Sequence, residues 1–162
     1  MSQEFDFDHT VIAPLHFLVP EGSIPVVPVF VNALIPPLPS ASRCFAFGRA
    51  IGAAVRAAPQ PARVAAIASG SFSLEIGGPR ISETSHTGVP APEWVDRVMA
   101  LLGDGAVDEL VGEATDERLA HAGNAGGELL EWIVMLGMIE ARPPAFLDAQ
   151  PAFGHAYAAW PG

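Results

Sequence analysis

The stretch IPVVPVFV, residues 24–31, decides the fold predicted for this chain. It is rich in valine and isoleucine and follows the turn-forming residues 20–23, PEGS, so it is typical of a buried strand. Pro25 and Pro28 favour an edge strand or a bulge, because proline has no backbone N–H to donate to a ladder.

A helix and a second strand are predicted after this stretch. Ser40 can cap a helix that runs to about Ala58. Arg63–Ser69 then has the pattern of a short buried strand. Strand, helix and strand in this order, joined by a crossover of about thirty residues, indicate a parallel pair. We therefore expect an α/β fold with a mixed or partly parallel sheet and flanking helices. Four residues of the helix fall near one face: Phe47, Ile51, Ala54 and Val55.

The C-terminal third is predicted to be helical. Before it, residues 70–90 are rich in Gly, Ser and Thr and are expected to form a long loop of the kind that often carries function. Beyond Pro143 the sequence has little regular pattern, and residues 1–162 show no repeat or shift of composition, so we expect one unit. Gly or the capping residue Thr115 separates four predicted helices: Ala91–Leu102, Val107–Glu113, Asp116–Ala122 and Ala125–Glu140.

The composition argues against several classes of protein. The net charge of −10 comes from 18 acidic and 8 basic residues, and all the basic residues are arginine. The chain therefore lacks the lysine of a P-loop or a Schiff base, and it has no basic patch for nucleic acid. Cys44 has no partner for an internal disulfide, which fits a cytoplasmic protein. Neither a signal peptide nor a membrane span is expected, because the N-terminus is acidic and proline interrupts the longest apolar stretch.

Two residues could carry chemistry. His9 lies beside two aspartates, and a nearby carboxylate can fix the tautomer of an imidazole and move its pKa, as acid–base catalysis requires. The alternative is a solvated histidine near a frayed terminus. Glu128 shares a helix face with Trp132, Met135 and Ile139. Its carboxylate either points into the core, paired or bound to a metal, or stays in water and interacts with the helix dipole.

The other motifs are weaker. Residues 70–73, GSFS, resemble a nucleophile turn but lack its closing glycine. Residues 123–127, GNAGG, open a helix without matching GxGxxG. No complete metal site can be assembled from local motifs, because no HxxxH or HExxH spacing links the remaining histidines: His16, His86, His121 and His155.

Taken in order, the motifs resemble one enzyme family. They are Asp8-His9 with Pro14-Leu15, IPVVPV at 24–29, GRAIG at 48–52, SGSFS at 69–73, EWVD at 93–96, and AGNAGGE at 122–128 with Trp132. This series resembles the catalytic (beta) subunit of the class III extradiol ring-cleavage dioxygenases, the protocatechuate 4,5-dioxygenase-like family, over nearly the whole chain. The resemblance implies a non-haem Fe(II) enzyme that uses dioxygen to open a catechol-type substrate such as protocatechuate, gallate or a related diol.

The resemblance also implies residue roles. In the family, two histidines from the first half of the subunit and one glutamate from the second half hold the iron. Glu128 matches that glutamate, and His9 matches a histidine that handles the catechol proton without binding iron. The half that carries both histidine ligands has no counterpart here. We therefore expect residues 1–162 to be the C-terminal part of the catalytic domain, which works with the missing half or a partner subunit, in an oligomer.

Further expectations follow from the resemblance. His9 and Glu128 should face a common cleft, and apolar surface should be exposed where the missing half packs. Several family members have histidine at the position of Leu74, which leaves the identity of the catechol open. Two other hypotheses remain: a non-catalytic remnant or binding module of the same fold, and a serine hydrolase that uses one of the serines at 71 and 73. The substrate pocket is expected to include residues of both loop motifs: Ser71, Phe72, Ser73 and Asn124.

Overall fold

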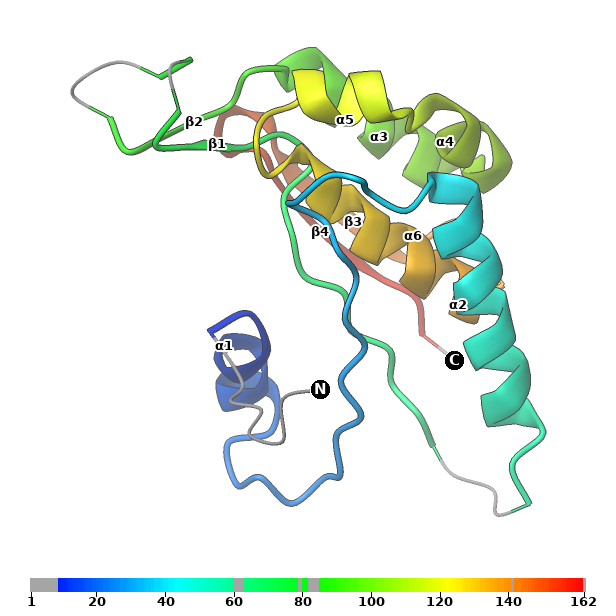
Figure 1. The fold of residues 1–162 in the computed structure, drawn as a ribbon. Helices are drawn as coiled ribbons and strands as arrows, with labels where there is room; N and C mark the ends of the chain where they lie inside the picture. The colour runs from blue at the N-terminus through cyan, green and yellow to red at the C-terminus, as the bar shows by residue number, and fades with distance from the viewer. Residues whose placement is uncertain (1–8, 60–62, 79, 82–84, 141, 162) are drawn as a thin grey trace. The chain divides into compact units, whose positions relative to one another are not determined.

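The computed structural model describes residues 9–59, 63–78, 80–81, 85–140 and 142–161. The chain divides into two compact units, Met1–Phe30 and Val31–Gly162, at a point where the sequence shows no boundary. The first unit contains helix α1 (His9–Leu18), which includes Pro14 and is followed by extended backbone (Figure 1).

Two helices form the centre of the second unit. Helices α2 (Ala41–Arg56) and α6 (Leu129–Met138) lie side by side (Figure 1). The predicted cap of α2 is confirmed, because the side chain of Ser40 accepts a hydrogen bond from the backbone N–H of Arg43. Almost every residue of α6 is buried, as expected for a helix that is apolar all round.

The face of α2 that packs is the one with small side chains. Cys44, Gly48 and Gly52 are buried, whereas Phe47 and Val55 are exposed. A Cβ at Gly48 would overlap the carbonyl oxygen of Val134 on α6, so glycine is what lets the two backbones approach. Burial also raises the pKa of the Cys44 thiol. Of the larger apolar residues that the sequence grouped on one face, Phe47 and Val55 are thus left on the outside of this unit, whereas Ile51 is partly buried against the core.

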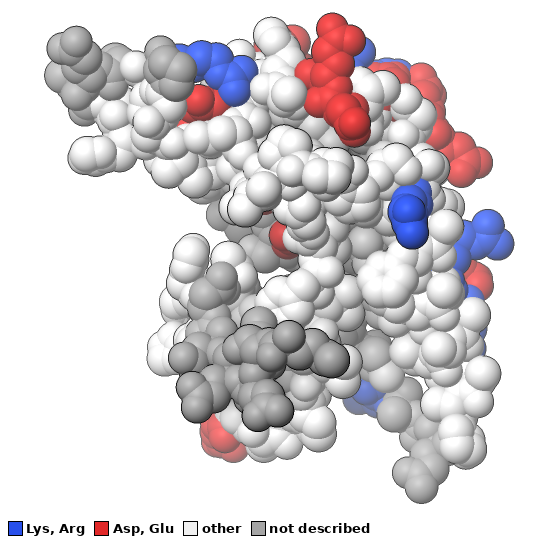
Figure 2. Space-filling model, in the orientation of Figure 1, with Lys and Arg blue, Asp and Glu red and all other residues white. Residues whose placement is uncertain are grey.

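Three further helices cover one end of the pair. They are α3 (Pro92–Asp104), α4 (Val107–Glu113) and α5 (Asp116–His121), close to the predicted bounds, and Thr115 caps α5 as expected. The guanidinium of Arg97 on α3 bonds the carboxylates of Glu109 and Glu113 on α4, and this contact holds the pKa of Glu113 below its usual value. Acidic side chains gather over α4 and α5 in Figure 2.

The segment beyond Pro143 corrects the sequence prediction. It was expected to lack regular structure, but β3 (Phe146–Gln150), the 3-10 helix η2 (Pro151–Phe153) and β4 (His155–Ala159) form an antiparallel hairpin. Leu147, Ala156 and Ala158 pack on the core. Because several of the alternating positions are alanine, the apolar and polar faces differ too little for the sequence pattern to reveal the strands.

The expected parallel pair is not formed within the described residues. Residues 24–31 and 63–69 are extended but are not strands, and Val64 and Ile67 are more than half exposed. A strand requires a neighbouring strand, and the sheets that do form are the hairpin β3–β4 and the short antiparallel pair β1 (Glu75–Ile76) and β2 (Thr87–Gly88). The class is therefore mixed α and β, with small antiparallel sheets.

No helix in the described ranges combines the length and the apolar character that crossing a membrane would require.

Candidate functional site

Two loops that lie about fifty residues apart in the sequence meet at the start of α6. The 3-10 helix η1 (Gly126–Glu128) leads into α6 and carries Glu128. The backbone N–H of Ser71 donates to Glu128 Oε2 at 2.7 Å, and Trp132 Nε1 donates to the carbonyl oxygen of Gly70 at 3.1 Å. The SGSFS and AGNAGGE motifs are therefore in contact within the second unit.

Glycine is required where these loops touch. Gly70 has φ of +129°, and a Cβ there would lie 2.7 Å from Glu128 Cβ. Gly123 has φ of +122°, and a Cβ there would overlap the carbonyl oxygen of Leu74. Both positions combine a backbone conformation that other residues rarely adopt with a close approach. The two loops can therefore interlock only with glycine at these points.

Phe72 and Ser73 are buried beneath the loop. The ring of Phe72 packs edge-on against Trp132, with 4.9 Å between ring centroids. Ser73 Oγ donates to the carbonyl oxygen of Ala122 at 2.9 Å and accepts from the N–H of Ala91 at 3.0 Å. A serine hydroxyl that is fully buried and engaged in both roles does not suit nucleophilic attack, which disfavours Ser73 as a hydrolase nucleophile.

Asn124 and Ser71 lie nearer the surface. The side chain of Asn124 imitates a neighbouring strand, because Oδ1 accepts from the N–H of Ile76 at 2.9 Å and Nδ2 donates to its carbonyl oxygen at 2.8 Å. Ser71 is 8% exposed and Asn124 is exposed, whereas Phe72 and Ser73 support the loop from within. Their contribution to a substrate pocket stays a prediction.

A charged pair that the sequence did not single out joins the same loops. Glu75 is buried, and its Oε2 accepts from the N–H of Asn124 at 2.8 Å and from Nη2 of Arg80 at 2.6 Å. Arg80 also donates to the carbonyl oxygens of Ala120 and His121 at the end of α5. No local pattern could have revealed this pair, because a glutamate in a loop rich in Gly, Ser and Thr normally lies in water.

Glu128 fits neither of the two arrangements expected from the sequence, a carboxylate that points into the core or one that stays in water and interacts with the helix dipole. Its side chain makes no capping hydrogen bond to the helix and is half buried. One oxygen is held by Ser71, and the described residues offer Oε1 no hydrogen-bond partner. An oriented carboxylate with an available oxygen fits a single iron ligand. Within the described ranges no three His, Cys, Asp or Glu side chains gather, so these residues do not form a complete metal site by themselves.

His9 belongs to the other compact unit. It is the first residue of α1, and its side chain is exposed. The expected cleft between His9 and Glu128 concerns two separate units, so it stays a prediction.

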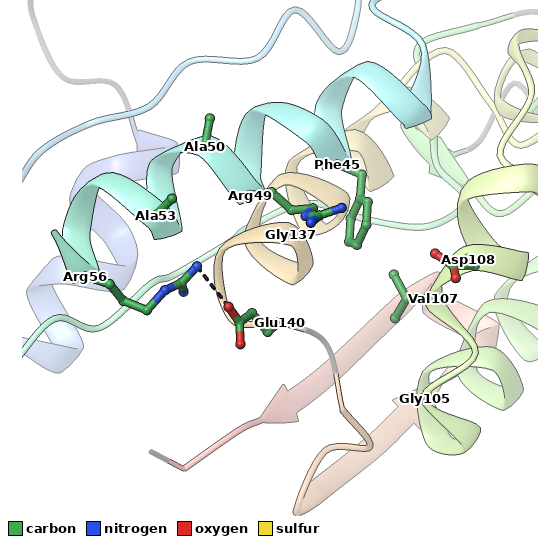
Figure 3. A pocket seen from close by; sticks show the side chains of 10 residues that line it. All are labelled: Phe45, Arg49, Ala50, Ala53, Arg56, Gly105, Val107, Asp108, Gly137 and Glu140. Carbon is green, nitrogen blue, oxygen red and sulfur yellow. Dashed lines mark ion pairs between the residues drawn. The ribbon is translucent and has the colours of Figure 1, made fainter.

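A groove of about 590 Å³ lies elsewhere on the second unit, between α2, α4 and the end of α6 (Figure 3). Phe45 and Arg49 line it, and the ion pair of Arg56 and Glu140 closes one side with 2.9 Å between Nη2 and Oε1. None of the predicted site residues lines this groove, so it is separate from the loops around Glu128.

Comparisons with known proteins identify similar sequences. A family model described as the catalytic LigB subunit of aromatic ring-opening dioxygenase matches residues 1–156. The chain is 29% identical to gallate dioxygenase of Pseudomonas putida over an alignment of 153 residues, with 88% of this chain and 43% of that protein covered. It is 27% identical over 180 residues to the 2,3-dihydroxyphenylpropionate/2,3-dihydroxicinnamic acid 1,2-dioxygenase of Klebsiella pneumoniae, with 87% of this chain and 57% of that protein covered.

The enzyme of the same name from Paraburkholderia xenovorans is also 27% identical, over 184 residues. No solved structure matches the chain. The chain spans about half the length of the curated relatives it matches, 43% of one and 57% of the others.

Proposed function

Since the chain belongs to the family of catalytic LigB subunits of aromatic ring-opening dioxygenases, we propose that it provides the Glu128 part of an Fe(II)-dependent extradiol dioxygenase. The substrate class is a catechol-type aromatic such as protocatechuate, gallate or a related diol. Both atoms of dioxygen enter the product, a ring-opened muconic semialdehyde. The named relatives, a gallate dioxygenase and dihydroxyphenylpropionate dioxygenases, support this choice of chemistry.

The contact between Glu128 and Ser71 carries the proposal. A carboxylate that binds iron must point one oxygen at the metal, and the Ser71 N–H fixes the other oxygen. Trp132 and Phe72 form an apolar support beside this carboxylate. Iron(II), when bound, supplies a centre at which the catecholate and dioxygen bind next to each other.

His9 is proposed as the general base. An imidazole titrates near neutral pH, so it can accept a phenolic proton from the catechol and return it later in the reaction. In this role His9 does not bind iron. The proposal therefore requires that the unit bearing His9 and the unit bearing Glu128 serve one site in the assembled protein.

The remaining iron ligands are proposed to come from polypeptide outside residues 1–162, on the same chain or on a partner subunit. The apolar side chains that this chain leaves exposed support such a partner, because a large exposed apolar surface usually marks an interface. In the second unit they include Leu34, Ile35, Phe47, Val64 and Ile67. We also propose that residues 63–69 become a strand of a partly parallel sheet there, in a cytoplasmic oligomer.

Two substitutions test the roles of Glu128 and His9 in the assembled enzyme. Glu128→Gln removes the anionic oxygen but keeps the size of the side chain, so the iron content should fall steeply while the fold survives. His9→Phe should keep the iron and lower turnover by roughly 10²–10⁴-fold, as is typical for a lost general acid or base. Iron content and oxygen uptake with a catechol substrate are measured on the same samples.

Glu117→Gln is the matched control, because Glu117 is an exposed carboxylate on α5. It should leave both iron and oxygen uptake unchanged. Full iron and full activity in Glu128→Gln would overturn the assignment of the ligand and favour a structural role for this carboxylate.

A further inference from the structure

The buried carboxylate of Glu75 has no part in the proposed chemistry. Among the described residues, Glu75 is the one charged residue that is buried, with an exposed fraction of 2%. Burying a carboxylate is unfavourable unless it is paired and hydrogen-bonded. Glu75 meets both conditions through Arg80 and the N–H of Asn124.

The partners of Glu75 lie next to the loop that carries Glu128. Asn124 precedes Glu128 by four residues, and η1 begins between them. Arg80 extends the contact to the last carbonyls of α5, at Ala120 and His121. The Glu75–Arg80 pair therefore ties β1 to the end of α5 and to the start of the Glu128 loop.

The same segment contacts Glu128 at its other end. Ser71 donates to the Glu128 carboxylate, and between Ser71 and Glu75 the N–H of Leu74 donates to Ala122 O at 2.9 Å and the carbonyl of Leu74 accepts from the N–H of Ala125 at 3.0 Å. Residues 71–75 are thus fixed along the second loop from Glu128 to Asn124. A shift at the Glu75 end would move the Ser71 N–H relative to the carboxylate that it orients.

We infer that Glu75 and Arg80 are positioning residues for Glu128: their ion pair sets the register between the two loops and so holds the Glu128 carboxylate in its metal-binding orientation. Neither residue touches the metal or the substrate in this assignment. The inference rests on the proposed role of Glu128 as an iron ligand. Residues that orient a metal ligand from behind typically change metal affinity by about 10–100-fold when they are replaced.

Glu75→Gln tests the inference with two measurements in the full protein. The first is hydrogen exchange of the Ser71 amide, which reports the contact with Glu128 Oε2 and should accelerate on the order of tenfold as the loop opens locally. The second is anaerobic titration of Fe(II) into the assembled enzyme, in which affinity should fall about 10–100-fold. Arg80→Gln changes the more exposed partner and should move both readouts in the same direction.

Glu113→Gln is the control, because it breaks the ion pair with Arg97 between α3 and α4 and leaves both loops intact. It should change neither the Ser71 exchange rate nor the iron affinity. Glu75→Gln and Arg80→Gln proteins that fold and change neither the Ser71 exchange rate nor the iron affinity would overturn the inference, and if Glu75→Gln fails to fold, Arg80→Gln decides.

A separate result would identify a failure of the proposed function. If Glu128→Gln keeps its iron while Glu75→Gln still exposes the Ser71 amide, the ligand assignment fails and the positioning of the carboxylate by the pair stands. If Glu128→Gln loses iron while Glu75→Gln changes neither readout, the proposed function stands and the inference fails.

Discussion

Residues 63–69 and residues 70–76 are consecutive, but they are held in different ways. The first segment has no strand beside it in the described chain, and its Val64 and Ile67 are exposed. The second segment is bonded through Gly70, Ser71, Leu74 and Ile76 to the loop before α6 and to α6 itself. The backbone of residues 70–76 is therefore fixed by partners in the same unit, whereas residues 63–69 have no neighbouring strand there.

The two segments also differ in what their sequence must provide. A loop that interlocks with another loop needs particular residues, such as Gly70, Gly123 and Asn124, at particular positions. A strand needs only apolar alternation and a neighbouring strand. Substitutions in the interlocked loops should therefore lower the free energy of unfolding strongly. Substitutions in residues 63–69 should lower it only slightly when the chain is studied without a partner.

The largest effect is expected for Gly123→Ala. The added Cβ would overlap the Leu74 carbonyl in a conformation with positive φ, so the free energy of unfolding should fall by about 3 kcal/mol or more. Gly77→Ala is the matched control, because Gly77 also has positive φ but has open space around it, and it should cost only about 1 kcal/mol. Urea denaturation measures both, and equal costs would contradict the interlocking of the loops.

A second substitution probes the contact between α2 and α6. Gly48→Ala should destabilise the protein by about 2 kcal/mol, because the clash with Val134 outweighs the better helix propensity of alanine. Gly112→Ala on α4 meets no atoms and should stabilise by about 0.5–1 kcal/mol. Thermal unfolding of the two variants should therefore shift in opposite directions, and a stabilising Gly48→Ala would show that the helices are farther apart.

A smaller effect is expected for the ion pair on α3 and α4. The hydrogen bond from Arg97 lowers the pKa of Glu113, so the folded state favours the charged carboxylate. This contribution to stability is present above the unfolded pKa of about 4.3 and is lost as the pH falls through the lower folded value. Glu113→Gln should thus be less stable than the wild type at neutral pH, and the difference should vanish in acid. A difference that is independent of pH would exclude this origin.

The smallest effect is expected in residues 63–69. Ile67→Thr should change the free energy of unfolding of the chain by less than about 0.5 kcal/mol, because the side chain is exposed. In the assembled enzyme the same change should weaken the proposed association with the remaining polypeptide, which size-exclusion chromatography can follow. Strong destabilisation of the chain alone would show that Ile67 is buried without a partner.

The sequence was sufficient where the structural signal is local. Ser40 and Thr115 cap the helices that they were predicted to cap, and α4 occupies the predicted bounds, because a cap and its helix lie within a few residues of each other. The order of the motifs also indicated the family, because a series of motifs can be recognised along the sequence without knowledge of the tertiary contacts. The match of residues 1–156 to the family model confirms it.

Other features depended on contacts between distant residues. The hairpin β3–β4 was missed because its alternating positions are largely alanine, and the packed face of α2 was missed because glycine and not a large apolar residue faces α6. The strands predicted at 24–31 and 63–69 have the expected composition, but a ladder also requires a neighbour.

The sequence by itself determined the helices from α2 to α6, the caps at Ser40 and Thr115, and the family, because hydrogen bonds within a few residues and the order of motifs are written along the chain. Only the tertiary structure decided that Ser71 holds Glu128 and that Glu75 and Arg80 join the same two loops. The contacts of Ser71 with Glu128 and of Glu75 with Asn124 join residues 57 and 49 positions apart. Nothing in the local pattern around a glutamate tells whether it will be hydrated or held by a distant N–H.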